Sequence, residues 1–99
     1  MIHVAVIGAQ GRMGATVVEA VNGADDMEFV AGLDAGDQII ASNLGGAEVA
    51  VDFSTPSVTE ANVHALLDAG VNVVVGTTGW SDESYERVRA HAEESGRCV

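Results

Sequence analysis

Residues 2–14 have the sequence IHVAVIGAQGRMG, in which an apolar run passes directly into a turn that contains three glycines. A continuous apolar run of this length is typical of a parallel strand that is covered on both faces. After the turn, residues 12–21 carry apolar side chains at helical spacing, and Asn22-Gly23 marks the end of that helix. The start of the chain therefore predicts a strand, a glycine turn and a helix in succession.

The rest of the chain alternates strands and helices in the same way. Thr55 and Ser81 are residues of the type that caps the amino end of a helix, and Pro56 suits a first helical position. Residues 38–44 fit either a short helix or an irregular loop. The pattern predicts strands at 28–33, 48–53 and 71–75, helices at 56–69 and 82–95, and the beginning of a fifth strand at 97–99.

This alternation predicts the fold class: α/β, with a Rossmann-type doubly wound parallel sheet. Parallel strands that are joined through helices require right-handed crossovers. We expect residues 1–99 to form one domain, because a chain of 99 residues leaves little room for a second core.

The composition excludes several classes of protein. Hydrophobic residues make up 47% of the chain, which argues against disorder, yet no apolar run approaches the roughly 18–20 residues that span a bilayer. The formal net charge is −11 and lysine is absent, so neither nucleic acid nor a membrane is an expected partner. Cys98 is the single cysteine and no basic leader segment precedes the first strand, so we expect a cytoplasmic protein.

The glycines of the turn are spaced G-x-x-G-x-x-G, one residue longer than the commonest dinucleotide-binding turn. Gly8 suits the sharp turn, Gly11 would let the backbone approach a pyrophosphate, and Gly14 would let helix and strand pack closely. Asp34 ends the next predicted strand, where a carboxylate can accept hydrogen bonds from ribose hydroxyls. The spacing predicts a site for NAD(H) or NADP(H); the alternative is a glycine turn without a ligand.

Other polar residues lie where this site would be. Arg12 is the only arginine or lysine before residue 87 and lies within the turn, so it is either a phosphate contact or a solvated helix residue. The segments FSTP at 53–56 and GTTG at 76–79 each follow a predicted strand, where ligands of open α/β sheets bind. The alternative for GTTG is a turn selected for its geometry alone.

The histidines and carboxylates show no further pattern of a reactive centre. No pair among His3, His64 and His91 has the spacing of metal ligands, and their roles stay open. The chain also offers no convincing general acid or base, so we predict no catalytic residue in it.

Three motifs together resemble those of a known family. They are VIGAQGRMG at 6–14, VDFSTP at 51–56 and VVGTTG at 74–79. In this order they resemble the amino-terminal, nucleotide-binding half of the 4-hydroxy-tetrahydrodipicolinate reductases. The resemblance implies an oxidoreductase that reduces a small cyclic imine with NADH or NADPH on the diaminopimelate branch of lysine biosynthesis.

The resemblance also implies the roles of single residues. Asp34 would hold the adenosine ribose, Phe53 would lie along the cofactor, and Thr78 would also be near the substrate. The pyrophosphate would be held by Gly8, Ala9, Gln10, Gly11, Arg12 and Met13, and the nicotinamide end by Gly76, Thr77 and Thr78.

The family continues with a second domain, which binds the substrate and builds a homotetramer, and residues 1–99 contain none of its motifs. We therefore expect this chain to bind a dinucleotide without reducing the imine. Two alternatives remain: the cofactor domain of a homoserine- or aspartate-dehydrogenase-like enzyme, and a non-catalytic module that senses dinucleotides. The GTTG turn argues against the first of these.

Overall fold

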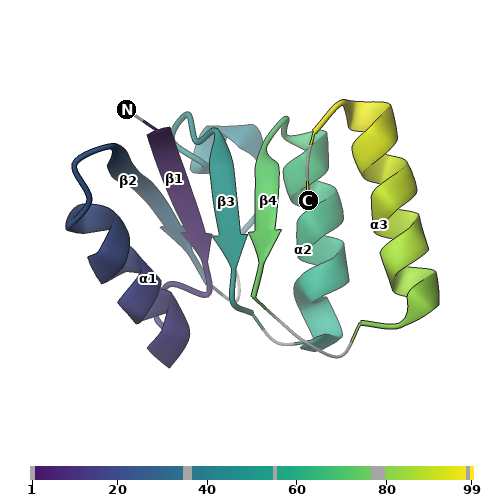
Figure 1. The fold of residues 1–99 in the computed structure, drawn as a ribbon, viewed down its shortest axis with the longest axis horizontal. Coiled ribbons are helices and arrows are strands. Elements are labelled where there is room, and N and C mark those ends of the chain that lie inside the picture. Colours follow the sequence, from purple (N-terminus) through teal and green to yellow (C-terminus); the bar gives the residue numbers. More distant parts are fainter. Residues whose placement is uncertain (1, 35–36, 55, 77–79, 98) are drawn as a thin grey trace.

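The computed structural model describes residues 2–34, 37–54, 56–76, 80–97 and 99. Four parallel strands form one sheet in the order β2-β1-β3-β4, and helices flank it (Figure 1). In chain order the elements are β1 (Ile2–Ile7), α1 (Arg12–Asn22), β2 (Met27–Leu33), the 3₁₀ helix η1 (Ala41–Asn43), β3 (Val49–Asp52), α2 (Pro56–Asp68), β4 (Asn72–Val75) and α3 (Asp82–Ser95).

The sheet is doubly wound about β1, which confirms the predicted fold class. The crossover through α1 leads from β1 to one edge of the sheet, whereas the crossover through α2 leads from β3 to the other edge. Right-handed crossovers that run in opposite directions place their helices on opposite faces. Figure 1 shows α1 on the side of β2, and α2 and α3 on the side of β4.

The core is aliphatic and lies mainly between the sheet and α2. The last four residues of β1 are all buried, as expected for a strand that is covered on both faces. On α2, the buried residues Val63, Leu66 and Leu67 recur at helical spacing, so one face of this helix covers the sheet. Burial of these side chains provides most of the stabilisation of the central strands.

The helices α2 and α3 meet along a seam of charged and imidazole side chains. Arg87 donates to both carboxylate oxygens of Glu60, at 2.8 and 3.0 Å. This guanidinium, helped by the Ser84 hydroxyl, lowers the pKa of Glu60 from 4.5 to about 2. The seam therefore contains a carboxylate that stays ionised in moderately acidic solution.

Two histidines extend the same seam. The Nδ1 atoms of His64 and His91 are 2.6 Å apart, and their ring centres are 4.8 Å apart with planes inclined by 19°. Because the facing nitrogens lie so much closer than the ring centres, the rings meet edge to edge. The Nε2 of His64 lies 3.2 Å from Glu60, and the Nε2 of His91 lies 2.7 Å from Asp68.

Several predicted boundaries differ from the structure: the starts of β2, β3 and β4 and the ends of β3 and α2 each lie one residue from the expected position. The third strand, expected at 48–53, ends at Asp52 because the Asp52 carboxylate accepts the N–H of Ser54 and turns the chain. The strand expected at 97–99 is not formed at Arg97 or Val99, since the Arg97 N–H donates to the Ala92 carbonyl at the end of α3. Cys98 lies outside the described residues.

The structure also bears on the predicted helix caps and on the segment 38–44, whose secondary structure was ambiguous. Ser81 caps α3, as predicted, by accepting the N–H of Ser84. Thr55, the expected cap of α2, lies outside the described residues. Within the ambiguous segment, the described residues form only the short 3₁₀ helix η1.

Candidate functional site

The turn between β1 and α1 depends on two of its glycines. Gly8 has a φ of +83°, a left-handed conformation that residues with a Cβ rarely adopt. Its N–H donates to the Leu33 carbonyl at 2.7 Å, which ties the turn to the end of β2. A Cβ at Gly14 would overlap the carbonyl oxygen of Gly8, so glycine alone lets α1 pack this closely. The local roles predicted for Gly8 and Gly14 are confirmed.

At the third glycine, Gly11, the absence of a side chain leaves open space beside the turn. Its backbone is extended, and a Cβ there would meet only the Gly8 carbonyl oxygen, at 3.3 Å. Among the described residues no side chain caps the start of α1, and the first turn of this helix carries no acidic residue. The first N–H groups of α1 are therefore placed to receive an anionic ligand at the positive end of the helix dipole.

Asp34 follows β2 and is held from both sides. Its Oδ1 accepts the backbone N–H of Gln10 at 2.9 Å, which connects the end of β2 to the glycine turn. The N–H of Asp34 donates to Oδ2 of Asp37 at 2.9 Å, and the N–H of Asp37 donates to the Asp34 carbonyl at 3.0 Å. The carboxylate of Asp34 is thus fixed beside the turn.

A buried carboxylate fixes the loop after β3. Oδ1 of Asp52 accepts both the backbone N–H of Ser54, at 2.7 Å, and the Ser54 hydroxyl. Oδ2 of Asp52 accepts the Thr59 hydroxyl at 3.2 Å, and the Asn62 amide donates to Ser54 Oγ at 3.0 Å. This network joins the end of β3 to α2 and holds the loop in place.

These segments surround one cavity of about 500 Å³, which we call the glycine-turn cavity. It opens at the carboxyl ends of β1, β2 and β3, where ligands of open α/β sheets bind. Its volume is in the range of small-molecule sites. The polar lining consists of Asp34, Asp37, Ser54 and Asn62, and the apolar lining includes Ile39 and Val58.

The cavity brings together four of the nine described residues that were predicted to hold the cofactor. Those that line it are Gly8, Gly11, Asp34 and Phe53. The turn residues that are not among the described lining are Ala9, Gln10, Arg12 and Met13. Of these, Gln10 contributes through its backbone N–H.

The predicted nicotinamide end is described only in part. A Cβ at Gly76 would overlap the ring of Phe53, so this ring lies against the end of β4. The N–H of Gly76 also donates to the Asp52 carbonyl at 2.9 Å. Thr77 and Thr78 lie outside the described residues, so their predicted contacts stay predictions.

Two polar residues of the described cavity lining were not singled out from the sequence. Asn62 lies one helical turn after Val58 on α2, so the spacing i, i+4 could have placed it beside the loop. Asp37 lies in the segment whose secondary structure was ambiguous, and no sequence pattern marked it.

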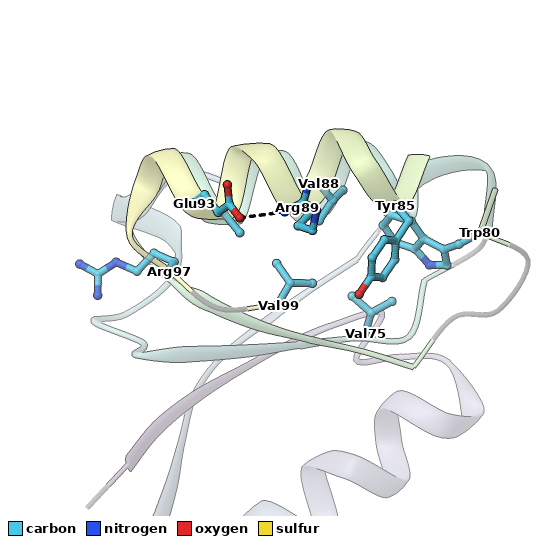
Figure 2. Close-up of a pocket in the computed structure, with 9 residues that line it drawn as sticks. Val75, Trp80, Tyr85, Val88, Arg89, Glu93, Arg97 and Val99 are labelled. Atoms are coloured by element: carbon cyan, nitrogen blue, oxygen red, sulfur yellow. Dashed lines mark hydrogen bonds and ion pairs between the residues drawn. The ribbon is translucent and has the colours of Figure 1, made fainter. Parts of the chain in front are cut away.

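A second cavity, of about 420 Å³, lies between β4 and α3, away from the glycine turn. Figure 2 shows Trp80 and Tyr85 near Val75, with Val99 beneath α3. Arg89 and Glu93, which also line it, are joined by an ion pair of 2.8 Å. This cavity offers mainly apolar surface, and two of its three charged lining residues pair with each other, so it is a weaker candidate for a reactive site.

In the described part of the chain, no group of three or more His, Cys, Asp or Glu side chains is arranged to hold a metal ion. None of the described helices has both the length and the apolar character that crossing a membrane requires.

Curated relatives match almost the whole chain. The 4-hydroxy-tetrahydrodipicolinate reductase of Beutenbergia cavernae is 60% identical over 90 residues, and that of Bifidobacterium animalis subsp. lactis is 52% identical over 95 residues. The alignments cover 91% and 96% of this chain but 36% and 38% of the relatives. The chain thus spans less than two fifths of their length.

Solved structures are similar over the same range. A dipicolinate-bound dihydrodipicolinate reductase from Paenisporosarcina sp. TG-14 has a TM-score of 0.83 and 28% identity, covering 99% of this chain and 46% of that one. A biliverdin reductase from Synechocystis sp. PCC 6803 has a TM-score of 0.81 at 15% identity, covering 98% of this chain and 36% of that one. At that identity the second likeness concerns the fold alone.

The glycine turn, the loop after β3 and the end of β4 also lie within the match to one protein family. The sequence model of that family, described as dihydrodipicolinate reductase, N-terminus, matches residues 2–99. By this match and by the identity to its relatives, the chain belongs to the dihydrodipicolinate reductase family, with similarity to its amino-terminal part.

Proposed function

We propose that the glycine-turn cavity binds NADH or NADPH, and that the full-length protein is a 4-hydroxy-tetrahydrodipicolinate reductase. One observation carries the proposal: the hydrogen bond from the Gln10 N–H to the Asp34 carboxylate. It joins a turn suited to phosphate and a carboxylate suited to ribose at one cavity. Membership of the reductase family supports the same assignment.

The residues around the cavity suit the successive parts of a dinucleotide. Backbone N–H groups at the start of α1 would donate to the pyrophosphate beside Gly11. Asp34 would accept the ribose hydroxyls through Oδ2, because Oδ1 is engaged by Gln10. Phe53 would lie along the cofactor, and Gly76 to Thr78 would hold its nicotinamide end.

The chain's part in the reaction is to bind and orient the cofactor. When bound, the reduced nicotinamide would supply a hydride to the substrate. The proposed substrate is the cyclic imine of the diaminopimelate branch of lysine biosynthesis, with Thr78 near it, and the reductase names of the relatives support this proposal. The remainder of the full-length protein would complete the substrate site and the homotetramer.

We also propose that the 99-residue chain does not reduce the imine alone. Asp34 and Asp37 lie at the proposed ribose end of the cavity, and Asp52 is buried in hydrogen bonds. None of these carboxylates is placed to donate a proton to a substrate beside the nicotinamide. Turnover of freshly generated imine by the purified chain would contradict this proposal.

The carboxylate of Asp34 favours NADH over NADPH. A 2′-phosphate would meet like-charge repulsion there, in a chain whose formal net charge is −11. Arg12, exposed at the first turn of α1, is the nearest cation in the sequence and would offset part of that repulsion. We therefore expect a modest preference for NADH, which Asp34→Ala reduces and Arg12→Ala increases.

Gly11→Val tests the proposal directly. The valine side chain would extend from Gly11 into the space proposed for the pyrophosphate. The extended backbone suits a β-branched residue, and the Gly8 carbonyl oxygen, 3.3 Å from the new Cβ, needs to shift by only a few tenths of an ångström. Calorimetric titration with NADH should show binding by the parent chain and none by the variant, while circular dichroism and thermal unfolding stay nearly unchanged.

Ala20→Val is the matched control, since it adds a β-branched residue to the exposed far end of the same helix. It should bind NADH as the parent does. Unchanged affinity in Gly11→Val, or no binding by the parent chain, would show that the turn does not hold a dinucleotide.

A further inference from the structure

Asp37 has no role in the glycine motif or in the family resemblance, yet it is tied to Asp34. Its side chain accepts the Asp34 N–H at 2.9 Å, and its own N–H donates to the Asp34 carbonyl at 3.0 Å. Both residues line the glycine-turn cavity. Asp37 therefore supports the backbone of Asp34 and brings a second carboxylate to the same wall.

The charges around this wall are unbalanced. Among the described residues that line the cavity, Asp34 and Asp37 are the only charged ones. The Oδ2 of Asp37 is engaged by a neutral N–H group, so its charge is oriented but not cancelled. A ligand at this end of the cavity therefore meets two negative charges that are held in fixed positions.

We propose that Asp37 is a positioning and specificity-determining residue for the dinucleotide, and the inference rests on the proposed function of the cavity. Its hydrogen bond would position Asp34 for the ribose diol. Its charge would act against a 2′-phosphate, which brings up to two negative charges where NADH carries a hydroxyl group. Removal of the charge should reduce the discrimination against NADPH, and removal of the hydrogen bond should weaken the binding of NADH.

Two substitutions separate these effects. Asp37→Asn keeps an oxygen that can accept the Asp34 N–H but removes the charge. It should strengthen NADPH binding about fivefold and leave NADH within about twofold, because two unit charges about 4 Å apart in water interact by about 1 kcal/mol, which is roughly fivefold in affinity. Asp37→Ala should strengthen NADPH similarly but weaken NADH severalfold, because Asp34 loses its support.

The measurement is calorimetric titration of the 99-residue chain with NADH and with NADPH, at low salt and at 0.5 M salt. At the higher salt concentration the Debye length is roughly 4 Å. The gain of Asp37→Asn for NADPH should shrink at the higher salt. Asp25→Asn is the control: it removes one exposed carboxylate before β2, at the opposite end of that strand, and should leave the NADPH-to-NADH ratio unchanged.

The outcomes distinguish this inference from the proposed function. If the parent chain binds neither dinucleotide, both are overturned. If it binds them and Asp37→Asn leaves the ratio unchanged, or Asp25→Asn shifts it equally, Asp37 does not determine specificity and the proposed function stands. If Asp37→Ala binds NADH as tightly as the parent, the positioning role is overturned.

Discussion

The two sides of the sheet are stabilised by different kinds of contact. In the glycine-turn region, formed by β1, α1 and β2, backbone atoms approach closely, as Gly14 does to the Gly8 carbonyl. In the two-helix region, formed by α2, β4 and α3, charged side chains meet, as Arg87 and Glu60 do. Backbone approach tolerates changes of pH and salt but no added methyl group. Side-chain pairing has the opposite sensitivity. The proposed ligand site combines the close backbone approach of the glycine turn with the carboxylate of Asp34.

The largest effect is expected from Gly14→Ala. Its Cβ would overlap the backbone of Gly8, so either the turn or α1 must move. Overpacking of this severity lowers the free energy of unfolding by about 3 kcal/mol. Urea unfolding would measure it.

Gly23→Ala is the control at the other end of the same helix. Its φ is −83°, and a Cβ there would make only an ordinary contact of 3.4 Å. Stability should stay within about 0.5 kcal/mol of the parent. Equal effects of Gly14→Ala and Gly23→Ala would show that close approach does not govern the glycine-turn region.

Asp52→Ala tests the boundary between the two regions. It removes the acceptor of the Ser54 N–H and of the buried Thr59 hydroxyl, and the loss of buried hydrogen bonds to a charged group should cost about 2–3 kcal/mol. Thr59→Val removes only one of these contacts and should cost about 1 kcal/mol by the same urea measurement. A larger loss of stability in Thr59→Val than in Asp52→Ala would show that Asp52 does not hold the loop after β3 in place.

Glu60→Gln tests the pH sensitivity of the two-helix region. Its pKa is about 2 in the folded chain and 4.5 as a free group, so its ionisation stabilises the fold fully above pH 4.5. That stabilisation declines as the pH falls from 4.5 towards 2. The difference in melting temperature between parent and variant should therefore be largest near neutral pH and shrink across this window.

Glu19→Gln, an exposed carboxylate on α1, controls for the loss of one negative charge. The difference in melting temperature between this variant and the parent should not shrink in the same way between pH 4.5 and 2. A melting-temperature difference between Glu60→Gln and the parent that stays constant over that range would show that the Arg87–Glu60 ion pair does not stabilise the seam.

The smallest effect is expected from Arg89→Ala. Arg89 pairs with Glu86 and Glu93 along one exposed face of α3, at 2.9 and 2.8 Å. Exposed pairs of this kind contribute little to stability, and salt screens them. Thermal unfolding in 1 M sodium chloride should show no difference between the variant and the parent.

Much of the fold could be predicted because local patterns coincide with it. The apolar run of β1 and the cap at Ser81 depend on neighbours in the sequence. The spacing from Gly14 to Asp34 is itself a product of the strand–helix–strand unit, which brings Asp34 to the glycine turn and to the cavity beside it.

The remainder depends on contacts between distant residues. The end of β3 was misplaced because the turn comes from the side chain of Asp52, and strand propensity does not report such bonds. Asp37 and Asn62 join the cavity through tertiary packing. His64 and His91 carried no signal either, since 27 positions separate them on different helices.

The two histidines of the seam offer a limited number of N–H groups to the contacts that they make. Three contacts run in series, from Glu60 to His64, from His64 to His91, and from His91 to Asp68, and each requires one N–H group. Two neutral imidazoles carry only two. Only one of the two facing Nδ1 atoms can carry a hydrogen atom. A second would set N–H against N–H across 2.6 Å. The donor and acceptor roles of the two rings are therefore linked, and the tautomer of one ring fixes that of the other across the contact between α2 and α3.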